Sequence, residues 1–278
     1  MSENVDQPEA PAAGVAVIVV NFRTGELTAA AVRSVLADPA VQEVVVVDNG
    51  SGDGSADFLR SALPGPRVQI VESPANLGFG GGVNLGVGAA GAPFLFLLNS
   101  DAVAQPGALD RLRRVLVEDA GAGVVAPAVY LADGVTLQDD AYGPIPVPGA
   151  LLRTNPGRGS DVAPGWVSGV AMMLRRDDFL ALGGFDPDFV MYLEDVDLCR
   201  RIRASGMRVV REPSAAVVHL GGRSGTGGAT RIGQYHRSKL VYLRKAGAGP
   251  VQLRCAAVLA VMRLSAERLR SRSGILHP

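Results

Sequence analysis

The sequence predicts an α/β fold in which a mostly parallel sheet carries helices on both faces. Apolar, β-branched runs alternate four times with helical patterns up to Asp119, an order typical of parallel strands joined by crossover helices. The run 15–20 is continuously apolar and 43–47 repeats its pattern, as expected of strands that are buried on both faces. Polar residues directly follow three of the runs, at the sheet edge where such folds bind ligands.

The elements up to Asp119 follow from local patterns, taken in chain order. Ser55 is a good N-cap for the second helix, and Pro106 suits the first turn of the fourth. Glycines dominate the third helix. The predicted strands are 15–20, 43–47, 68–71 and 94–98, and the predicted helices are 26–36, 55–63, 78–88 and 106–119.

The pattern changes after Val125. Residues 130–164 are rich in Pro, Gly and Asp, which predicts loops with short strands, and residues 166–174 form another apolar run. Residues 1–13 are acidic and rich in Pro and Ala, so we expect a disordered tail. We further expect a helix over 195–204, short strands over 207–210 and 215–219, a flexible glycine-rich loop over 221–228, and helices from 230 onward with a break at 247–250.

The composition argues against several classes of protein. The 278 residues include 27 basic and 27 acidic ones, so no overall charge attracts nucleic acid, and none is expected as a partner. Two cysteines, Cys199 and Cys255, provide neither a disulfide framework nor a metal quartet. No apolar run is long enough to span a bilayer, and the first residues lack the basic start of a signal peptide. We therefore expect a cytoplasmic protein.

Two motifs indicate a nucleotide. Asp48, in the run Asp-Asn-Gly-Ser, can accept the imide N–H of a pyrimidine, although these residues are also typical of a polar turn. The glycine-rich segment 76–84 can bring backbone close to a phosphate, or can serve tight packing of a helix on the sheet. Val83 stands at the third glycine position of G-x-G-x-x-G, so the dinucleotide fingerprint is absent.

Acidic residues mark two further places. Asp101 suits a hard cation bound together with phosphates, or a turn before Pro106. Glu194 and Asp195 open a helix, where acids also complement the helix dipole. Apolar neighbours can raise the pKa of such a carboxylate toward that of a useful base. His219 ends an apolar strand, a position where a single histidine is more often structural than catalytic.

Together these motifs resemble glycosyltransferase family 2, of the GT-A fold, and in particular its bacterial rhamnosyltransferase-like branch. The resemblance covers about residues 15–236. It implies a nucleotide-sugar-binding half over 14–129 and an acceptor and catalytic half over 130–249, which forms the C-terminal acceptor-side lobe. A basic helix over 250–278 follows. The resemblance rests on Asn21, Asp48-Asn-Gly-Ser51, Asn76-x-Gly-Phe79, Asn99-x-Asp101, Gly183-Gly-Phe-Asp186 and Glu194-Asp-x-Asp-Leu-Cys-Arg200.

The resemblance also implies a reaction and its residues. A sugar, with rhamnose as first choice, would pass with inversion from a dTDP- or UDP-sugar to a hydroxyl of a glycan or lipid-linked glycan. Asp195 would be the catalytic base, and Asp101 and His219 would hold Mg²⁺ or Mn²⁺. Asn99 replaces the first acid of the family's Asp-x-Asp motif, which weakens that metal site. The donor-binding candidates are Asn21, Asp48, Asn76, Gly78, Asn84 and Ser100, and the acceptor-side candidates are Trp166 and Glu194.

Alternatives remain open at this point. The acceptor could be a soluble natural product, or the chain could be a sugar-nucleotide nucleotidyltransferase or a non-catalytic nucleotide-sugar-binding module. A nucleotidyltransferase is expected to have a basic, glycine-rich loop after the first strand. Here that segment contains only Arg23 and Gly25 of the expected residue types. The arginine-rich final helix suits either packing on the domain or peripheral contact with the inner face of the plasma membrane. A homodimer is also left open.

Overall fold

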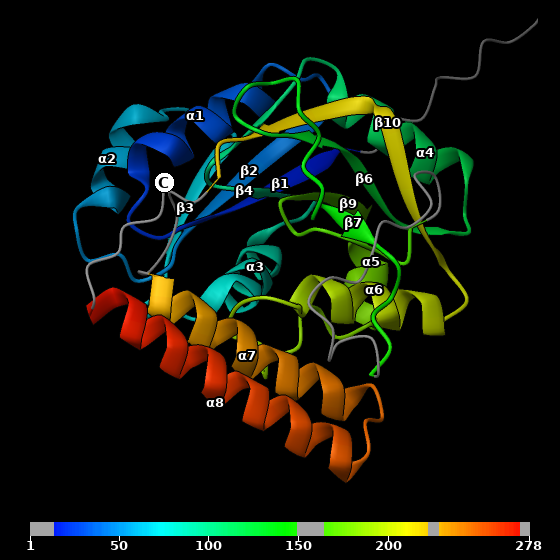
Figure 1. The fold of residues 1–278 in the computed structure, drawn as a ribbon. Helices are drawn as coiled ribbons and strands as arrows, with labels where there is room; N and C mark the ends of the chain where they lie inside the picture. The colour runs from blue at the N-terminus through cyan, green and yellow to red at the C-terminus, as the bar shows by residue number, and fades with distance from the viewer. Residues whose placement is uncertain (1–13, 149–163, 222–227, 273–278) are drawn as a thin grey trace, which may run out of the picture.

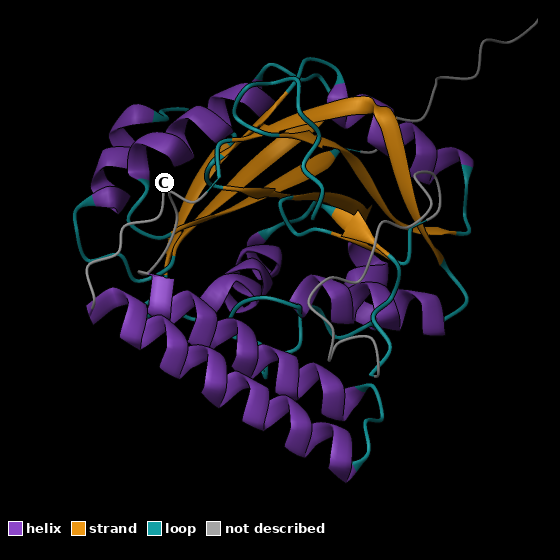
Figure 2. Ribbon diagram, in the orientation of Figure 1, coloured by secondary structure: helices purple, strands orange, loops and turns teal. Residues whose placement is uncertain are grey.

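The computed structural model describes residues 14–148, 164–221 and 228–272. One curled eight-stranded sheet forms its centre, with helices on both faces (Figures 1 and 2). The predicted tail over 1–13 and all but the ends of the predicted loop over 221–228 lie outside the described residues. The division into halves at 129 and 249 stays a prediction.

The strands and helices follow one another largely as the sequence predicts. The strands are β1 (Val15–Asn21), β2 (Val41–Asp48), β3 (Val68–Glu72), β4 (Phe94–Asn99), β5 (Ala102–Ala104), β6 (Ala122–Tyr130), β7 (Tyr142–Gly143), β8 (Trp166–Val167), β9 (Ala171–Arg175) and β10 (Arg208–His219). The helices are α1 (Gly25–Leu36), α2 (Ser55–Ala62), α3 (Gly78–Ala89), α4 (Ala108–Glu118), α5 (Arg176–Ala181), α6 (Glu194–Ala204), α7 (Gly228–Lys245) and α8 (Pro250–Arg272).

The order of strands in the main sheet is β3-β2-β1-β4-β9-β6-β10-β5. Strands β3, β2, β1 and β4 pair in parallel, as do β6 and β10, whereas β9 and β5 run antiparallel to their neighbours. Because β1, β2 and β4 run in parallel, Asn21, Asp48 and Asn99 end at the same edge of the sheet. The mostly parallel sheet with helices on both faces is therefore confirmed.

Two predicted segments differ from the structure. The apolar run 166–174 is not one element: β8 pairs with β7 in a separate small sheet, and β9 enters the main sheet after a turn at 168–170. The predicted break between strands 207–210 and 215–219 is wrong, because β10 continues as one strand of 12 residues. A register shift between Glu212 and Ala216 absorbs the polar residues of that interval as a bulge.

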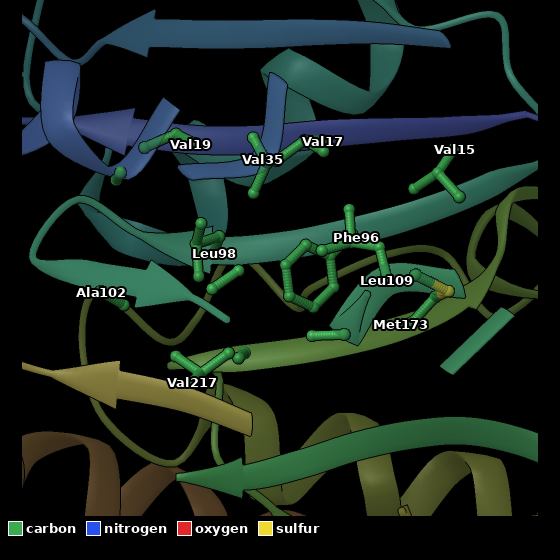
Figure 3. Close-up of a cluster of buried hydrophobic side chains, with 14 of the residues drawn as sticks. Val15, Val17, Val19, Val35, Phe96, Leu98, Ala102, Leu109, Met173 and Val217 are labelled. Carbon is green, nitrogen blue, oxygen red and sulfur yellow. The ribbon is translucent and has the colours of Figure 1, made fainter. Parts of the chain in front are cut away.

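Apolar side chains fill both faces of the sheet. On one face Val15, Val17 and Val19 of β1 pack with Phe96 and with helices α1, α2 and α4, as part of the cluster in Figure 3. On the other face the alternate residues of β1 and β2 pack under α3 and α6. Successive side chains of β1 point alternately to the two faces of the sheet, and each face has its own apolar core. This is why β1 is apolar throughout.

Helices α7 and α8 form an antiparallel hairpin that lies beyond α3 and α6 (Figure 1). A third apolar cluster joins the hairpin to the body through Phe189, Val196 of α6 and Tyr242 of α7. The phenol of Tyr242 donates a hydrogen bond to the carbonyl of Pro146 at 3.1 Å. No helix within the described residues has the length and apolarity needed to cross a membrane.

Candidate active site

The first part of the site is a polar network at the ends of β1 and β2. The Asp48 carboxylate accepts hydrogen bonds from Asn21 Nδ2 and Ser51 Oγ, both at 2.6 Å, and from the Ser51 N–H at 3.2 Å. Asn21 is fully buried, and its Oδ1 accepts hydrogen bonds from the hydroxyls of Thr24 and Thr28. Asn21 therefore holds Asp48 in place from behind.

A second set of contacts ties this network to the glycine-rich segment. Asn49 Nδ2 donates to Asn76 Oδ1 at 3.2 Å and to the Gly78 carbonyl at 2.9 Å, and Asn76 Oδ1 also accepts from the Gly78 N–H at 2.9 Å. Gly78 has φ of +76°, and a Cβ there would overlap the carbonyl of Val190. Asn76 and Gly78 therefore let this loop touch the segment that leads to Glu194.

Helix α3 lies unusually close to the sheet. A Cβ at Gly82 would come within 2.8 Å of Val20, and one at Gly86 within 2.7 Å of Ile18. The Asn84 amide binds the backbone of Phe185 with both ends, since its Nδ2 donates to the carbonyl at 2.7 Å and its Oδ1 accepts from the N–H at 2.9 Å. For Gly82, Asn84 and Gly86 the geometry favours tight packing, the structural interpretation of this segment.

The two predicted metal ligands, Asp101 and His219, lie next to each other and are connected to the Asn21 network through Ser100. The hydroxyls of Thr24 and Ser100 share a hydrogen bond at 3.1 Å, which connects the Asn21 network to the residue before Asp101. The Asp101 side chain is fully buried, and its Oδ1 lies 3.2 Å from Nε2 of His219, whose side chain is 13% exposed. Residues that are far apart in the sequence thus meet because β5 pairs with the end of β10.

Gln138 completes this group. Its Oε1 lies 2.8 Å from His219 Nδ1, and its Nε2 donates to Asp140 at 2.8 Å. Because the Gln138 amide is oriented by Asp140, its oxygen faces the ring and accepts the Nδ1–H of His219. With the proton on Nδ1, the lone pair of Nε2 faces the Asp101 carboxylate. Two lone-pair-bearing atoms, one nitrogen and one oxygen, then face each other, and a metal cation between them could be bound by both.

These donors fit a divalent metal only in part. One carboxylate and one imidazole are enough where substrate phosphates and water supply the remaining ligands. Within the described part of the chain, no three His, Cys, Asp or Glu side chains lie close enough together to hold a metal by themselves. A metal here would therefore depend on the ligand as well as on Asp101 and His219.

Glu194 and Asp195 begin α6 after a strained turn. Tyr192 and Leu193 both have left-handed backbone angles, with φ of +71° and +67°, which is uncommon for such large residues. Asp195 Oδ2 accepts the Gly169 N–H at 2.9 Å, and its Oδ1 accepts the Val196 N–H at 2.8 Å. The turn and these two hydrogen bonds fix the direction of the Asp195 carboxylate.

The two neighbouring carboxylates have perturbed acidity. Burial, with a smaller contribution from the Asp195 charge, raises the pKa of Glu194 to about 8. Burial also raises the pKa of Asp195, but the backbone N–H groups of Gly169, Val196 and Asp195 itself oppose that shift. Glu194 Oε2 is buried and accepts no hydrogen bond from the part of the chain that the structure describes. The hydrogen bonds to Asp195 favour its charged form, so of the two coupled carboxylates Glu194 holds a proton more readily.

The third acid of this helix has a different position. The Asp197 side chain is fully buried and forms ion pairs with Arg200 and Arg201, both at 2.8 Å. Arg201 in turn donates to the carbonyls of Leu182 and Gly184. Asp197 thus holds the Gly183-Gly184 turn against α6.

Trp166, the other acceptor-side candidate, is half-buried in β8. It packs against the apolar cluster beneath α6 and also against the cluster that joins the hairpin to the body. Its indole Nε1 is buried and has no hydrogen-bond partner within the described residues.

The structure thus joins the predicted residues into two groups, the network around Asp48 and the segment around Glu194 and Asp195, linked by the contact of Gly78 with Val190. Sequence reasoning missed the residues that position others: Thr24, Asn49, Ser51 and Gln138. Asn49 and Ser51 stand inside the Asp-Asn-Gly-Ser run and could have been found from that motif. No local signal marks Gln138, because its contact with His219 spans 81 residues.

Comparison with known proteins decides the family. A family model described as glycosyl transferase family 2 matches residues 16–179, which is more than half of the chain. This chain belongs to glycosyl transferase family 2. A second model, described as the N-terminal domain of galactosyltransferase, matches residues 162–221 and so includes the Glu194-Asp195 region of this glycosyltransferase.

Two curated bacterial relatives match the glycosyltransferase. An N-acetylglucosaminyl-diphospho-decaprenol L-rhamnosyltransferase of Mycobacterium tuberculosis H37Rv is 29% identical over 202 residues, which are 63% of this chain and 66% of that protein. The match therefore spans slightly less than two thirds of the relative. Rhamnosyltransferase WbbL of Escherichia coli K12 is 38% identical over 60 residues, 22% of this chain and 23% of that one.

Solved structures show the same fold. GalNAc-T7 with UDP, GalNAc and Mn²⁺ aligns with a TM-score of 0.65 at 15% identity, covering 83% of this chain and 48% of that one. The mannosyltransferase PcManGT of Pyrobaculum calidifontis, in complex with GDP-Man and Mn²⁺, aligns with a TM-score of 0.60 at 18% identity, covering 94% and 76%. The GT-A fold expected from the sequence is confirmed.

Proposed function

We propose that this glycosyltransferase moves a sugar, with rhamnose as the first choice, from a dTDP- or UDP-sugar to a hydroxyl of a lipid-linked glycan, with inversion. The observation that carries the proposal is the Asp195 carboxylate, held by Gly169 and Val196 beside a protonated Glu194. A charged, oriented and partly desolvated carboxylate is what a general base requires. A non-catalytic binding module would have no use for it.

The donor side supports a pyrimidine. Three protein donors occupy the Asp48 carboxylate, which has about four lone-pair positions, so one position remains for the imide N–H of uracil or thymine. Asn21 and Ser51 fix the direction of that carboxylate. Asn76, Gly78 and Ser100 border the same edge, while Asn84 acts through the turn it holds.

Asp101 and His219 would hold the divalent metal, Mg²⁺ or Mn²⁺, together with the donor diphosphate. Bound there, the metal would stabilise the negative charge of the leaving diphosphate as a Lewis acid. The neighbouring Mn²⁺-containing structures share the fold with this chain, and the pairing of Asp101 with His219 supports the same chemistry here. Gln138 fixes the His219 ring so that Nε2 faces the carboxylate.

The transfer step follows from the position of Asp195. Its carboxylate removes the proton of the acceptor hydroxyl, and the hydroxyl oxygen forms a bond to the anomeric carbon. The bond from that carbon to the diphosphate oxygen breaks on the opposite face, and the nucleoside diphosphate leaves. A single displacement needs no covalent enzyme intermediate, and the anomeric configuration inverts.

The acceptor is proposed from the relatives and from the last helix. The Mycobacterium relative is named for a diphospho-decaprenol acceptor, which is a lipid-linked sugar. On α8, Val251, Val258 and Met262 are 72%, 59% and 62% exposed, and their spacing of seven and four residues aligns them on one side of the helix. The opposite side, with Ala256 and Ala260, is buried.

Helix α8 thus has two apolar sides, one packed on the protein and one uncovered. Exposed arginines, Arg254 and Arg263, flank the uncovered strip of Val251, Val258 and Met262. A helix of this kind lies in the plane of an anionic membrane surface, and the cytoplasmic leaflet is the one that carries such lipids. We therefore place the reaction at that leaflet. If the acceptor were a soluble natural product, the transfer reaction would not explain why this apolar strip is exposed.

The proposal is tested by donor binding and product analysis. Of dTDP, UDP and GDP, the first two should raise the melting temperature in the presence of Mn²⁺, because a ligand of the folded state stabilises it by mass action. Asp48→Asn should weaken this effect for both. Stronger stabilisation by GDP, or a product with retained configuration, would contradict the proposal.

A further inference from the structure

Phe79, in the first turn of α3, belongs to the glycine-rich motif but has no role in the transfer step. Its side chain is half-buried and packs against the apolar cluster that lies under α3 and α6. The rings of Phe79 and Phe185 are tilted against each other with centroids 5.8 Å apart, and the Phe79 N–H donates to the Val190 carbonyl at 3.2 Å. Phe79 therefore belongs to the surroundings of α6 and not to the Asp48 network.

Three segments meet at Gly169, in the turn between β8 and β9. A Cβ added to Gly169 would lie 3.0 Å from Cε1 and 3.5 Å from Cζ of Phe79, and 3.7 Å from Cβ of Asp195. The edge of the Phe79 ring therefore packs against the same backbone whose N–H donates to Asp195 Oδ2 at 2.9 Å. The ring of α3, the β8–β9 turn and the carboxylate of α6 thus form one packed unit.

Space, and not backbone conformation, explains the glycine at position 169. The φ angle of Gly169 lies outside the left-handed region, so an alanine can adopt the same backbone conformation. A Cβ 3.0 Å from a ring carbon, however, is closer than carbon atoms pack without strain. Gly169 and Phe79 are therefore complementary, because the ring occupies the place that a side chain at 169 would take.

Backbone hydrogen bonds hold the residues on either side of Gly169. The Ser168 N–H donates to the Ala141 carbonyl at 2.8 Å, and the Val170 carbonyl accepts the Asn99 N–H at 2.9 Å. These bonds fix the two neighbours but leave the peptide N–H of Gly169 itself to be held by other contacts. The packing of the aromatic ring supplies such a contact, because it limits movement of the turn away from the carboxylate.

The Gly169 hydrogen bond affects the acidity of the proposed base. It favours the charged form of Asp195 and so opposes burial, which raises the pKa of that carboxyl. Two other ionisable groups interact with Asp195 through their charge, namely Glu194 before it and Cys199 one turn further along α6. Residues 77–82 and 168–170 contain no ionisable side chain, so this part of the surroundings acts on Asp195 through geometry alone.

We propose that Phe79 is a positioning residue for the base, whose ring holds the Gly169 N–H on the Asp195 carboxylate. This inference rests on the proposed function, since it takes Asp195 as the base, and it adds a second-segment support that the motif alone did not reveal. The same glycine-rich motif contacts the Asp48 network through Asn76. The motif therefore serves both groups of site residues, the donor network through its amide and the base through its aromatic ring.

The test compares Phe79→Leu, Gly169→Ala and the double variant in the full chain. Leucine at 79 stays apolar but lacks the Cε1 and Cζ atoms that contact the turn, and alanine at 169 pushes its Cβ against the ring. The titration midpoint of Asp195 is read from the pH dependence of its carboxyl ¹³C signal, which is assigned by its loss in Asp195→Asn. This measurement needs neither donor nor acceptor.

Each single variant should move the Asp195 midpoint to higher pH by about one pH unit, the usual effect of losing a charge-assisted hydrogen bond. In the double variant the alanine Cβ fills the space that the ring leaves, so the midpoint should return toward that of the wild type. The affinity for UDP should stay within a few-fold of the wild type in all three. Phe179→Leu is the matched control, because Phe179 packs edge-on against Phe185 at 5.6 Å and lies at the far end of the same row of rings. It should lower the melting temperature without moving the midpoint.

Three results would overturn the proposal. One is a midpoint in folded Phe79→Leu and Gly169→Ala that equals that of the wild type. Another is a double variant whose shift is the sum of the two single shifts, since the residues would then act independently. The third is a loss of UDP affinity in Phe79→Leu with an unmoved midpoint, which would make the ring a donor contact.

Failure of the proposed function would look different. In that case the wild type would bind neither UDP nor dTDP, or Asp195→Asn would transfer sugar as fast as the wild type, whatever the midpoints of the Phe79 and Gly169 variants. If nucleotides bind, Asp195→Asn is inactive and only the shift of the midpoint is missing, Asp195 remains the base and Phe79 loses its positioning role.

Discussion

The Oδ2 atom of Asp195 accepts a hydrogen bond from the Gly169 N–H at 2.9 Å, across 26 residues of sequence. Gly169 lies in the turn between β8 and β9, where a Cβ would come within 3.0 Å of the Phe79 ring. A small residue is therefore needed for the backbone to reach the carboxylate. This contact joins the centre of the sheet to the start of α6 and orients the proposed base.

Asp195→Asn should remove transfer while donor binding persists. An amide keeps the shape of the carboxylate but cannot take the proton, and loss of a general base typically lowers the rate by about 10²- to 10⁴-fold. The measurement is turnover with a dTDP- or UDP-sugar, together with nucleotide affinity. Turnover within a few-fold of the wild type would show that another group is the base.

Asp197→Asn is the informative comparison. This acid is buried with Arg200 and Arg201 as partners, so its loss should destabilise folding by about 2 kcal/mol or more. Chemical denaturation measures that effect. The variant that remains folded should turn over substrate near the wild-type rate, and a Tm equal to that of the wild type would refute the structural role.

Glu194 should make stability depend on pH. Its pKa of about 8 lies above the ordinary value of 4.5, so the folded protein holds this proton when the unfolded chain has released it. Stability from this group is therefore complete below about pH 4.5 and is lost as pH rises to about 8, by up to about 5 kcal/mol. The melting temperature of Glu194→Gln should vary less over this interval than that of the wild type. Glu118→Gln, at an exposed position, should behave as the wild type does.

Metal affinity should depend on three residues to different degrees. Asp101→Asn and His219→Gln each remove a proposed ligand and should weaken Mn²⁺ binding in the presence of UDP by more than about tenfold. Gln138→Ala, which only frees the His219 ring, should have a smaller effect. Electron paramagnetic resonance of Mn²⁺ measures binding without activity. Equal affinity of His219→Gln and the wild type would return His219 to a structural role.

Membrane contact should depend on the uncovered strip of α8. The double variant Val258→Ser and Met262→Ser changes only exposed positions, whereas removal of the whole helix would uncover the buried contacts of Ala256. Sedimentation with phosphatidylglycerol vesicles should show less binding for the variant, and binding of the wild type should fall with salt because each arginine contributes about 1 kcal/mol. Concentration-dependent dimerisation in place of vesicle binding would assign the strip to a second copy of the chain.

The sequence by itself determined the main elements and the residues at their ends. Residues 15–20, 44–47 and 94–98 are continuously apolar and are followed by Asn21, Asp48 and Asn99, so the parallel order and the ligand edge could both be predicted. The acids at the start of α6 were also recognisable, because a motif of adjacent residues can be identified without knowledge of the fold. Strands β5 and β8 escaped prediction, since segments of two or three residues carry no periodicity. Strand β6 and helix α5 were not predicted either.

Only the tertiary structure decided what each polar residue contacts. The sequence grouped Asn21 with Asp48 as donor ligands, but burial of Asn21 makes it a support for Asp48. Glu194 and Asp195 are neighbours in the chain, yet hydrogen bonds from Gly169 and Val196 favour the charged form of Asp195 alone, while burial raises the pKa of Glu194 to about 8. The physical reason is that burial and hydrogen bonding depend on partners from distant segments, whereas periodicity and motifs depend only on residues nearby in the sequence.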